Sequence, residues 1–155
     1  MTRVIGPIPL GDEEATSTLA RRLAARAESG DTFLLHGPIG AGKSHFARAF
    51  IRARLGNPDE DVPSPTFTLV QTYQDTGAEI WHCDLYRLTH PDEVIELGLD
   101  EAFADAICLI EWPDRLGSSR PDKAIDITLS AEATGHRATI RLPADKADRL
   151  GPALD

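Results

Sequence analysis

The chain has 155 residues, of which 41% are hydrophobic and 26% are charged, a length and composition that predict one domain with a sizeable core. Its formal net charge of −9 disfavours direct binding to nucleic acid, because an acidic chain without a compensating basic face is repelled by phosphates. No apolar run approaches membrane-spanning length, and no signal peptide is recognisable at the start. We therefore expect a cytoplasmic protein without membrane contact.

Neither cysteine, Cys83 or Cys108, belongs to a Cys-x-x-Cys arrangement, and each lies in an apolar segment. We expect buried, reduced thiols rather than zinc ligands or a disulfide. Arginines gather on two expected helical stretches where alanines separate them: Arg21, Arg22, Arg26, Arg48, Arg52 and Arg54. This pattern favours a solvated helix face over a binding patch.

The N-terminal part of the chain alternates strand and helix patterns. Residues 3–10 are predicted as a short strand and residues 13–29 as a helix with Asp12 as its N-cap. The apolar run Thr32–His36 predicts a buried strand, and Lys43–Leu55 carries aromatic and aliphatic residues at helical spacing. These last two segments predict one βα unit.

The turn inside this βα unit carries the most specific motif of the chain. Residues 37–44 read Gly-Pro-Ile-Gly-Ala-Gly-Lys-Ser and match G-x-x-x-x-G-K-[S/T] in the strand-to-helix setting of a P-loop. The glycines let successive backbone N–H groups approach phosphate oxygens at the positive end of the following helix. Lys43 is expected to reach the β- and γ-phosphates, and Ser44 to ligate Mg²⁺. The motif therefore predicts binding of a nucleoside triphosphate.

The middle of the chain predicts a hairpin and then a central strand. Residues 67–73 and 80–85 read as strands joined by a turn at 75–77, and residues 91–97 as one or two helical turns. Residues 107–111 form a short apolar run that ends in an acid, which is typical of a central strand.

The C-terminal part predicts a second hairpin and a tail. Residues 124–129 and 137–142 alternate apolar and polar positions around Thr134-Gly135, which predicts a hairpin with one wet face. The tail from Pro143 is expected to be ordered only in part. The whole predicts an α/β fold with one P-loop NTPase-type domain at 1–142, a tail at 143–155, and a mixed central sheet flanked by helices and carrying β-hairpins.

Two acids lie where a P-loop protein would need them. Efficient hydrolysis requires a further acid that holds Mg²⁺ or orients water, and a flexible segment that senses the γ-phosphate. Asp84 and Glu111 each end a predicted strand, and ligands of α/β sheets sit at the carboxyl ends of strands. The sequence does not divide the work between the two acids, so we assign them jointly.

Four segments together resemble the TsaE family of small bacterial ATPases: Gly-Pro-Ile-Gly-Ala-Gly-Lys-Ser (37–44), Ser-Pro-Thr-Phe (64–67), His-Cys-Asp-Leu-Tyr-Arg-Leu (82–88) and Ile-Glu-Trp-Pro (110–113). Their order and spacing match from about residue 10 to residue 130. The family takes part in making threonylcarbamoyladenosine, the modified base beside the anticodon of tRNAs that read codons beginning with A. The resemblance implies an ATPase that drives the cycle of the threonylcarbamoyl-transfer complex, with ATP or ADP and Mg²⁺ as cofactors. It implies TsaB and TsaD as partners, with little direct tRNA contact.

The resemblance also implies roles for single residues. Lys43, Thr66, Asp84 and Glu111 are expected in catalysis, with Thr66 in a switch-like segment. Ser44, Asp84 and Glu111 are expected to serve magnesium, and the two acids also the attacking water. Contact with the nucleotide is expected along one stretch and from one aromatic residue: Gly37, Pro38, Ile39, Gly40, Ala41, Gly42, Lys43, Ser44, His45 and Trp112.

Three side chains in these motifs keep two interpretations each. Trp112 either lies beside the nucleotide or belongs to the core. By the two-residue period of a strand, His82 shares a face with Asp84, and it either orients that carboxylate or is a satisfied core histidine. Arg87 either reaches a phosphate or a partner's carboxylate, or forms a surface ion pair.

The chain departs from the family pattern at two positions of the P-loop. Pro38 stands where the family commonly has an acid, and Ser44 stands where it commonly has threonine. Serine still supplies a hydroxyl ligand, so only fine tuning is affected. Residues beyond about 131 carry no motif that we can match.

Two other functions fit a P-loop. A small-molecule kinase would need an arginine-bearing lid, for which residues 115–120 are the candidate segment. A nucleotide-gated binding module would bind ATP with only incidental hydrolysis. The absence of an Asn-Lys-x-Asp signature after the P-loop argues against GTP as the nucleotide.

Overall fold

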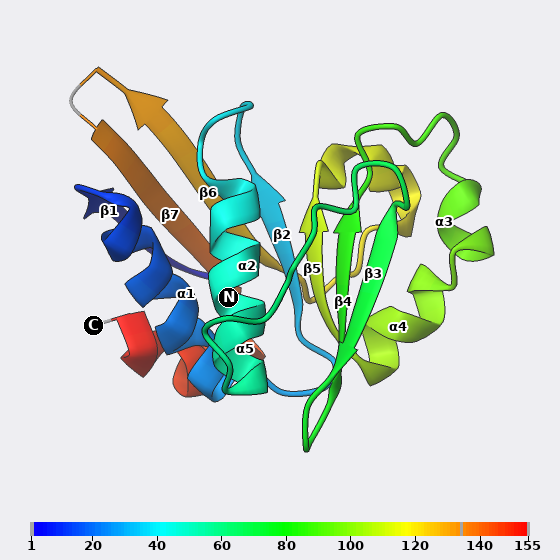
Figure 1. Ribbon diagram of the computed structural model, residues 1–155, viewed down its shortest axis with the longest axis horizontal. Coiled ribbons are helices and arrows are strands. Elements are labelled where there is room, and N and C mark those ends of the chain that lie inside the picture. The colour runs from blue at the N-terminus through cyan, green and yellow to red at the C-terminus, as the bar shows by residue number, and fades with distance from the viewer. Residues whose placement is uncertain (1, 134, 155) are drawn as a thin grey trace.

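A seven-stranded mixed sheet forms the centre of the molecule, with helices on both faces (Figure 1). The computed structural model describes residues 2–133 and 135–154. The strand order is β1-β7-β6-β2-β5-β4-β3. Strands β6, β2, β5 and β4 run parallel, whereas β1, β7 and β3 pair antiparallel with their neighbours. The predicted α/β fold with a mixed central sheet and β-hairpins is confirmed.

The elements in chain order are β1 (Thr2–Leu10), α1 (Glu13–Arg26), β2 (Thr32–His36), α2 (Lys43–Leu55), β3 (Val70–Gln74), β4 (Glu79–Asp84), α3 (Glu93–Glu96), α4 (Leu99–Asp105), β5 (Ile107–Glu111), the 3₁₀ helix η1 (Pro113–Ser119), β6 (Ile125–Glu132), β7 (Gly135–Pro143), α5 (Ala144–Leu150) and the 3₁₀ helix η2 (Gly151–Leu154). No helix among the described residues has the length and apolar character needed to span a membrane.

Two apolar cores lie on opposite faces of the sheet. Phe33 and Leu35 of β2 belong to the core that α1 and α2 cover, and the rings of Phe33 and Phe50 lie 5.2 Å apart. Leu34 belongs to the other core, together with Leu99 of α4 and Leu116 of η1. Successive side chains of a strand point to opposite faces, so a central strand covered on both sides must be apolar throughout.

Parallel pairing brings the carboxyl ends of three strands to one edge of the sheet. Leu35 of β2 is paired with Glu111 of β5, and Glu111 is paired in turn with Asp84 of β4. The P-loop leaves β2 at this same edge and leads into α2, as the upper part of Figure 1 shows. The two predicted acids and the P-loop therefore lie next to one another.

Helix α1 begins as predicted but ends earlier. The Asp12 side chain accepts a hydrogen bond from Ala15 N at 2.8 Å, which confirms it as the N-cap. The helix ends at Arg26 rather than at residue 29, because Ala27 is extended (φ −72°, ψ 147°) and the Glu28 N–H donates to Asp31 Oδ2 at 2.9 Å. The Arg54 guanidinium donates to the carbonyls of Ala24 and Ala27, at 3.0 and 2.9 Å. The prediction that Arg54 lies on a solvated face was therefore wrong.

The middle of the chain holds two further differences. Strand β3 begins at Val70 rather than at residue 67, because Leu69 has a φ of 67° and its N–H donates to Pro65 O at 2.7 Å. This closed turn takes residues 66–69 out of the ladder. Helix α4 (Leu99–Asp105) was not predicted; it follows Gly98 in the left-handed conformation and buries Leu99 and Ala102.

The second hairpin is confirmed by the antiparallel pairing of β6 and β7, although Thr134 of its predicted turn lies outside the described residues. The expectation of a partly ordered tail after Pro143 was wrong for residues 144–154. Helix α5 packs against α1, β1 and β7, and its Leu150 is fully buried.

An ion pair holds this C-terminal helix in place. Arg149 of α5 donates two hydrogen bonds of 2.7 Å to the carboxylate of Asp31, which is 1% exposed. Lys146 Nζ lies 3.3 Å from the same carboxylate. A buried carboxylate must be paired, and a bidentate guanidinium pairs it most effectively.

The two cysteines are buried free thiols, as expected. Burial raises the pKa of the Cys108 thiol to about 12, and it also raises the pKa of Cys83. Both thiols therefore stay protonated and belong to the core.

We predict that Arg149→Ala lowers the free energy of unfolding by about 2–3 kcal/mol, because Asp31 keeps only Lys146 as a charged partner. Urea unfolding followed by circular dichroism measures this loss. Arg22→Ala, at an exposed position of α1, is the control and should change stability by less than about 0.5 kcal/mol. Equal stabilities of the two variants would contradict the role given to the ion pair.

Candidate nucleotide site

The P-loop lies against the backbone of strand β6. Gly37 has a φ of 144°, and a Cβ atom at this residue would lie 2.4 Å from the carbonyl oxygen of Leu129. Only glycine fits this close approach. The loop is closed by a hydrogen bond of 3.1 Å from Ala41 N to Pro38 O, and His136 Nε2 lies 3.2 Å from Gly40 O. Strands β6 and β7 therefore form one wall of the loop.

Lys43, the first residue of α2, points back into the loop. Its ammonium donates to Gly37 O at 2.6 Å and lies 3.4 Å from the centroid of the Trp112 ring. Burial lowers the pKa of Lys43 from its ordinary value, while the nearby carboxylates of Glu111, Asp84 and Asp114 oppose that shift. The residue is only 6% exposed, so its charge has lost part of its water shell. Such a group favours an anion that replaces the lost water.

Glu111 is hydrogen-bonded through both carboxylate oxygens. Ser44 Oγ donates to Oε1 at 2.9 Å, and His82 Nε2 lies 2.7 Å from Oε2. The carboxylate accepts, so Nε2 carries the proton in this pair. Both side chains of the His82–Glu111 pair are nearly buried, and His82 Nδ1 has no hydrogen-bond partner within the described part of the chain.

This contact corrects one interpretation of His82. The imidazole binds the carboxylate of Glu111 on the neighbouring strand rather than that of Asp84, and it is buried and hydrogen-bonded, as the core-histidine interpretation expects. His82 and Asp84 were expected on the same face of β4. The cores agree with this, because side chains alternate along the strand: Ile80 packs in the core on the α2 side of the sheet, and Cys83 packs in the core on the other side.

Asp84 lies beside the segment that contains Thr66. Its Oδ1 accepts from Tyr86 N at 3.0 Å, and its Oδ2 lies 3.4 Å from Thr66 Oγ1. Thr66 Oγ1 is in turn 2.8 Å from Ser64 Oγ. The Asp84 backbone N–H donates to Leu69 O at 3.0 Å. The acid and the predicted switch-like segment thus form one hydrogen-bonded unit.

Trp112 and its neighbours border the site on the side of η1. Trp112 has a φ of 58°, and its indole lies between the ammonium of Lys43 and the ring of Tyr86, whose centroid is 5.0 Å away. Trp112 is therefore not a plain core residue. The guanidinium of Arg87 lies 4.5 Å from the centroid of the exposed Phe67 ring, an arrangement that neither interpretation of Arg87 anticipated.

The donor atoms at this edge of the sheet fit a magnesium ion. Mg²⁺ binds oxygen ligands and is usually held by one or two carboxylates together with substrate phosphates and water. Ser44 Oγ, Glu111 and Asp84 supply a hydroxyl and two carboxylates next to the P-loop.

The structure gathers most of the predicted site residues. Lys43, Ser44, Glu111 and Trp112 are joined by direct contacts, and Asp84 with Thr66 lies on the adjacent strand end. Two members of the predicted P-loop stretch differ from the rest in where their side chains lie. Ile39 is 80% exposed, and the His45 imidazole points to α1, where it is 2.8 Å from Ser17 Oγ.

Residues from the C-terminal hairpin were missed by the sequence reasoning. His136 and Leu129 contact the P-loop although they belong to no motif. Nothing in their spacing could have indicated this, because the contact depends on the pairing of β2 with β6. The partner of His82 was missed for a similar reason, although its place in the His-x-Asp motif was a usable signal.

A sequence model described as "Threonylcarbamoyl adenosine biosynthesis protein TsaE" matches residues 10–139. The chain belongs to the TsaE family. It is 40% identical over 120 residues to the tRNA threonylcarbamoyladenosine biosynthesis protein TsaE of Rickettsia bellii, covering 77% of this chain and 83% of that one. It is 36% identical over 125 residues to the TsaE protein of Bacillus subtilis, covering 80% and 77% respectively.

A solved structure shares this fold. The crystal structure of YdiB from Bacillus subtilis superposes with a TM-score of 0.81 at 27% sequence identity, covering 99% of this chain and 95% of that one. The similarity therefore extends beyond residue 139 to the C-terminal elements.

We predict that His82→Phe, which keeps an aromatic ring but removes the donor, lowers the free energy of unfolding by about 1–3 kcal/mol, since it leaves a buried carboxylate oxygen unpaired. Thermal unfolding of purified variants measures the effect. Adding Glu111→Gln to His82→Phe removes the buried charge and should recover part of the loss. Wild-type stability of His82→Phe would show that the pair does not fix Glu111.

Proposed function

We propose that this chain is a P-loop ATPase that binds ATP with Mg²⁺ and hydrolyses it to drive the turnover of a threonylcarbamoyl-transfer complex acting on tRNA. TsaB and TsaD are its proposed partners, and direct tRNA contact is minor. The observation that carries the proposal is the hydrogen bond of 2.9 Å between Ser44 and Glu111, because it joins the P-loop hydroxyl to the acidic strand ends. A phosphate-binding loop alone would not need this acid.

The side chains of the site have complementary tasks in this proposal. The Lys43 ammonium would exchange Gly37 O for phosphate oxygens, a charge-assisted contact. Ser44, Glu111 and Asp84 would hold Mg²⁺, which neutralises charge that develops on the transferred phosphoryl group. His82 would keep Glu111 oriented, leaving an oxygen beside Ser44.

The segment around Thr66 is suited to report the state of the nucleotide. The Thr66 hydroxyl reaches the Asp84 carboxylate by a hydrogen bond of 3.4 Å, which is long, and the neighbouring Phe67 is exposed. A γ-phosphate with Mg²⁺ would pull this segment toward the acids, and hydrolysis would release it. The change would alter the surface that a partner protein meets.

The structure gives little support to the kinase alternative. In its candidate lid, residues 115–120, Leu116 is buried, and Arg120 donates two hydrogen bonds to Asp126 at 2.9 and 2.7 Å. An arginine engaged in this way is not free to close over phosphates. The nucleotide-gated binding module is separated from the ATPase by experiment.

We predict that Lys43→Ala weakens ATP binding by about 1.5–3 kcal/mol, roughly tenfold to more than a hundredfold, because a charge-assisted contact to phosphate is lost. Isothermal titration calorimetry with Mg²⁺ present measures the affinity. Lys123→Ala, at an exposed lysine that pairs with Asp145, is the control and should bind ATP like the wild type. An unchanged ATP affinity of Lys43→Ala would show that the P-loop lysine does not bind the nucleotide.

Reconstitution with purified TsaB, TsaD, tRNA and threonylcarbamoyl donor tests the proposed function. We expect several modifications per transferase complex when the wild-type chain and ATP are present, and about one without them. Glu111→Ala should retain ADP binding but abolish Mg²⁺-dependent hydrolysis and repeated turnover. Full turnover with Glu111→Ala, despite lost hydrolysis, would favour the nucleotide-gated module instead.

A further inference from the structure

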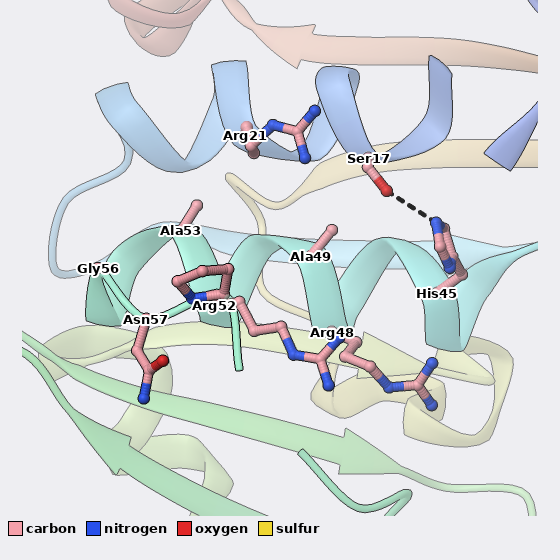
Figure 2. A pocket seen from close by; sticks show the side chains of 10 residues that line it. Ser17, Arg21, His45, Arg48, Ala49, Arg52, Ala53, Gly56 and Asn57 are labelled. Carbon is pink, nitrogen blue, oxygen red and sulfur yellow. Dashed lines mark hydrogen bonds between the residues drawn. The ribbon is translucent and has the colours of Figure 1, made fainter. Parts of the chain in front are cut away.

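A groove outside the nucleotide site lies between α1 and α2 (Figure 2). Its volume is about 330 Å³. Ala49 and Ala53 point from α2 toward α1 and give it an apolar floor, as Figure 2 shows. Arg21 of α1 and Arg48 and Arg52 of α2 are among its lining residues, and Figure 2 shows the Arg48 and Arg52 side chains pointing away from α1.

The positive charge of this groove is only partly balanced. Arg21 pairs with Glu14, but both side chains are exposed, so this pair contributes little. Arg52 donates to Glu60 O at 2.9 Å, a carbonyl that carries no net charge. Arg48 forms no ion pair within residues 2–133 and 135–154. A concave surface lined by one sign of charge attracts groups of the opposite sign, even on a chain of net charge −9.

The groove and the P-loop share helix α2. Helix α2, which forms its floor, begins with Lys43 and Ser44. At the end of the groove nearest the P-loop, His45 Nε2 is 2.8 Å from Ser17 Oγ and 3.0 Å from Glu13 O, so α1 and α2 are joined directly behind the phosphate loop (Figure 2). A ligand held between the two helices therefore contacts the element whose first turn would hold phosphate.

We propose that this groove binds an acidic segment of the partner protein, with carboxylates on the arginines and an apolar side chain on the alanine floor. The inference rests on the proposed function, because it takes the transferase subunits TsaB and TsaD as the source of that segment. The apolar floor suits a peptide side chain better than a phosphate backbone. Carboxylate recognition by guanidinium groups supplies the specificity.

The groove changes the interpretation of the arginines on these helices. The sequence favoured a solvated face, yet the packing of α1 against α2 brings Arg21 to the same hollow as Arg48 and Arg52. Arg22 follows directly on α1 but does not line the groove. The two kinds of arginine can therefore be compared within one protein.

The test measures binding of the full-length chain to the purified TsaB and TsaD subunits by calorimetry, with ATP and Mg²⁺ present. Arg48→Glu reverses the charge inside the groove, and Arg22→Glu makes the same change outside it. Each new glutamate has an arginine four residues later, Arg52 or Arg26, so the effects on the helices are matched. We expect Arg48→Glu to weaken partner binding roughly tenfold to a hundredfold, and Arg22→Glu less than about threefold.

Three further readouts separate the possible outcomes. ATP affinity of the isolated chain should be equal in wild type and Arg48→Glu, which verifies folding and leaves the nucleotide site out of the effect. Wild-type binding and turnover with no loss in Arg48→Glu would overturn the groove proposal alone, whereas failure of the wild type to support turnover would overturn the proposed function. Loss of tRNA binding in Arg48→Glu, with protein binding intact, would identify an RNA surface and also overturn the groove proposal.

Discussion

The buried carboxylate of Glu111 is the constraint on which the site depends. Because a buried charge is costly without partners, both of its oxygens must be met by donors. Ser44 supplies one donor from the first turn of α2, and His82 supplies the other from the adjacent strand. Both donors reach Glu111 only if β5 pairs in register with β4 and with β2, and if the P-loop places Ser44 at the strand end.

The Lys43 ammonium is also a buried charge that needs partners. In the structure it is stabilised by a backbone carbonyl and by the face of an indole, two weak substitutes for water. Three neighbouring acids favour its charged form although burial disfavours it. The ammonium therefore already lies in the loop, and binding a phosphate would need little reorganisation of the protein.

The sequence predicted those parts of the fold that depend on local pattern. The βα unit around the P-loop, the N-cap at Asp12 and the strand ends at Asp84 and Glu111 needed only motif, capping and periodicity. Contacts between distant segments were out of reach. Arg54 caps the last carbonyls of α1 from another helix, and the partner of His82 depends on strand register.

The C-terminal helix illustrates this limit most clearly. Its segment Ala-Asp-Lys-Ala-Asp-Arg-Leu has few apolar residues and no helix-forming pattern strong enough to predict order. The contacts that hold it come from Arg149 and Lys146 to Asp31, and Arg149 is 118 residues away from its partner. Such a pairing has no signature in a single sequence.

The anchoring of α5 also constrains how related chains can differ. The family match ends at residue 139, before this helix, yet the helix neutralises a carboxylate that precedes β2 inside the matched region. A chain that ends before this helix would leave the buried carboxylate of Asp31 without these charged partners. Such a chain has to carry an uncharged side chain at the position of Asp31, or bring a cation to it from another segment. The residue before β2 and the C-terminal helix therefore cannot vary independently.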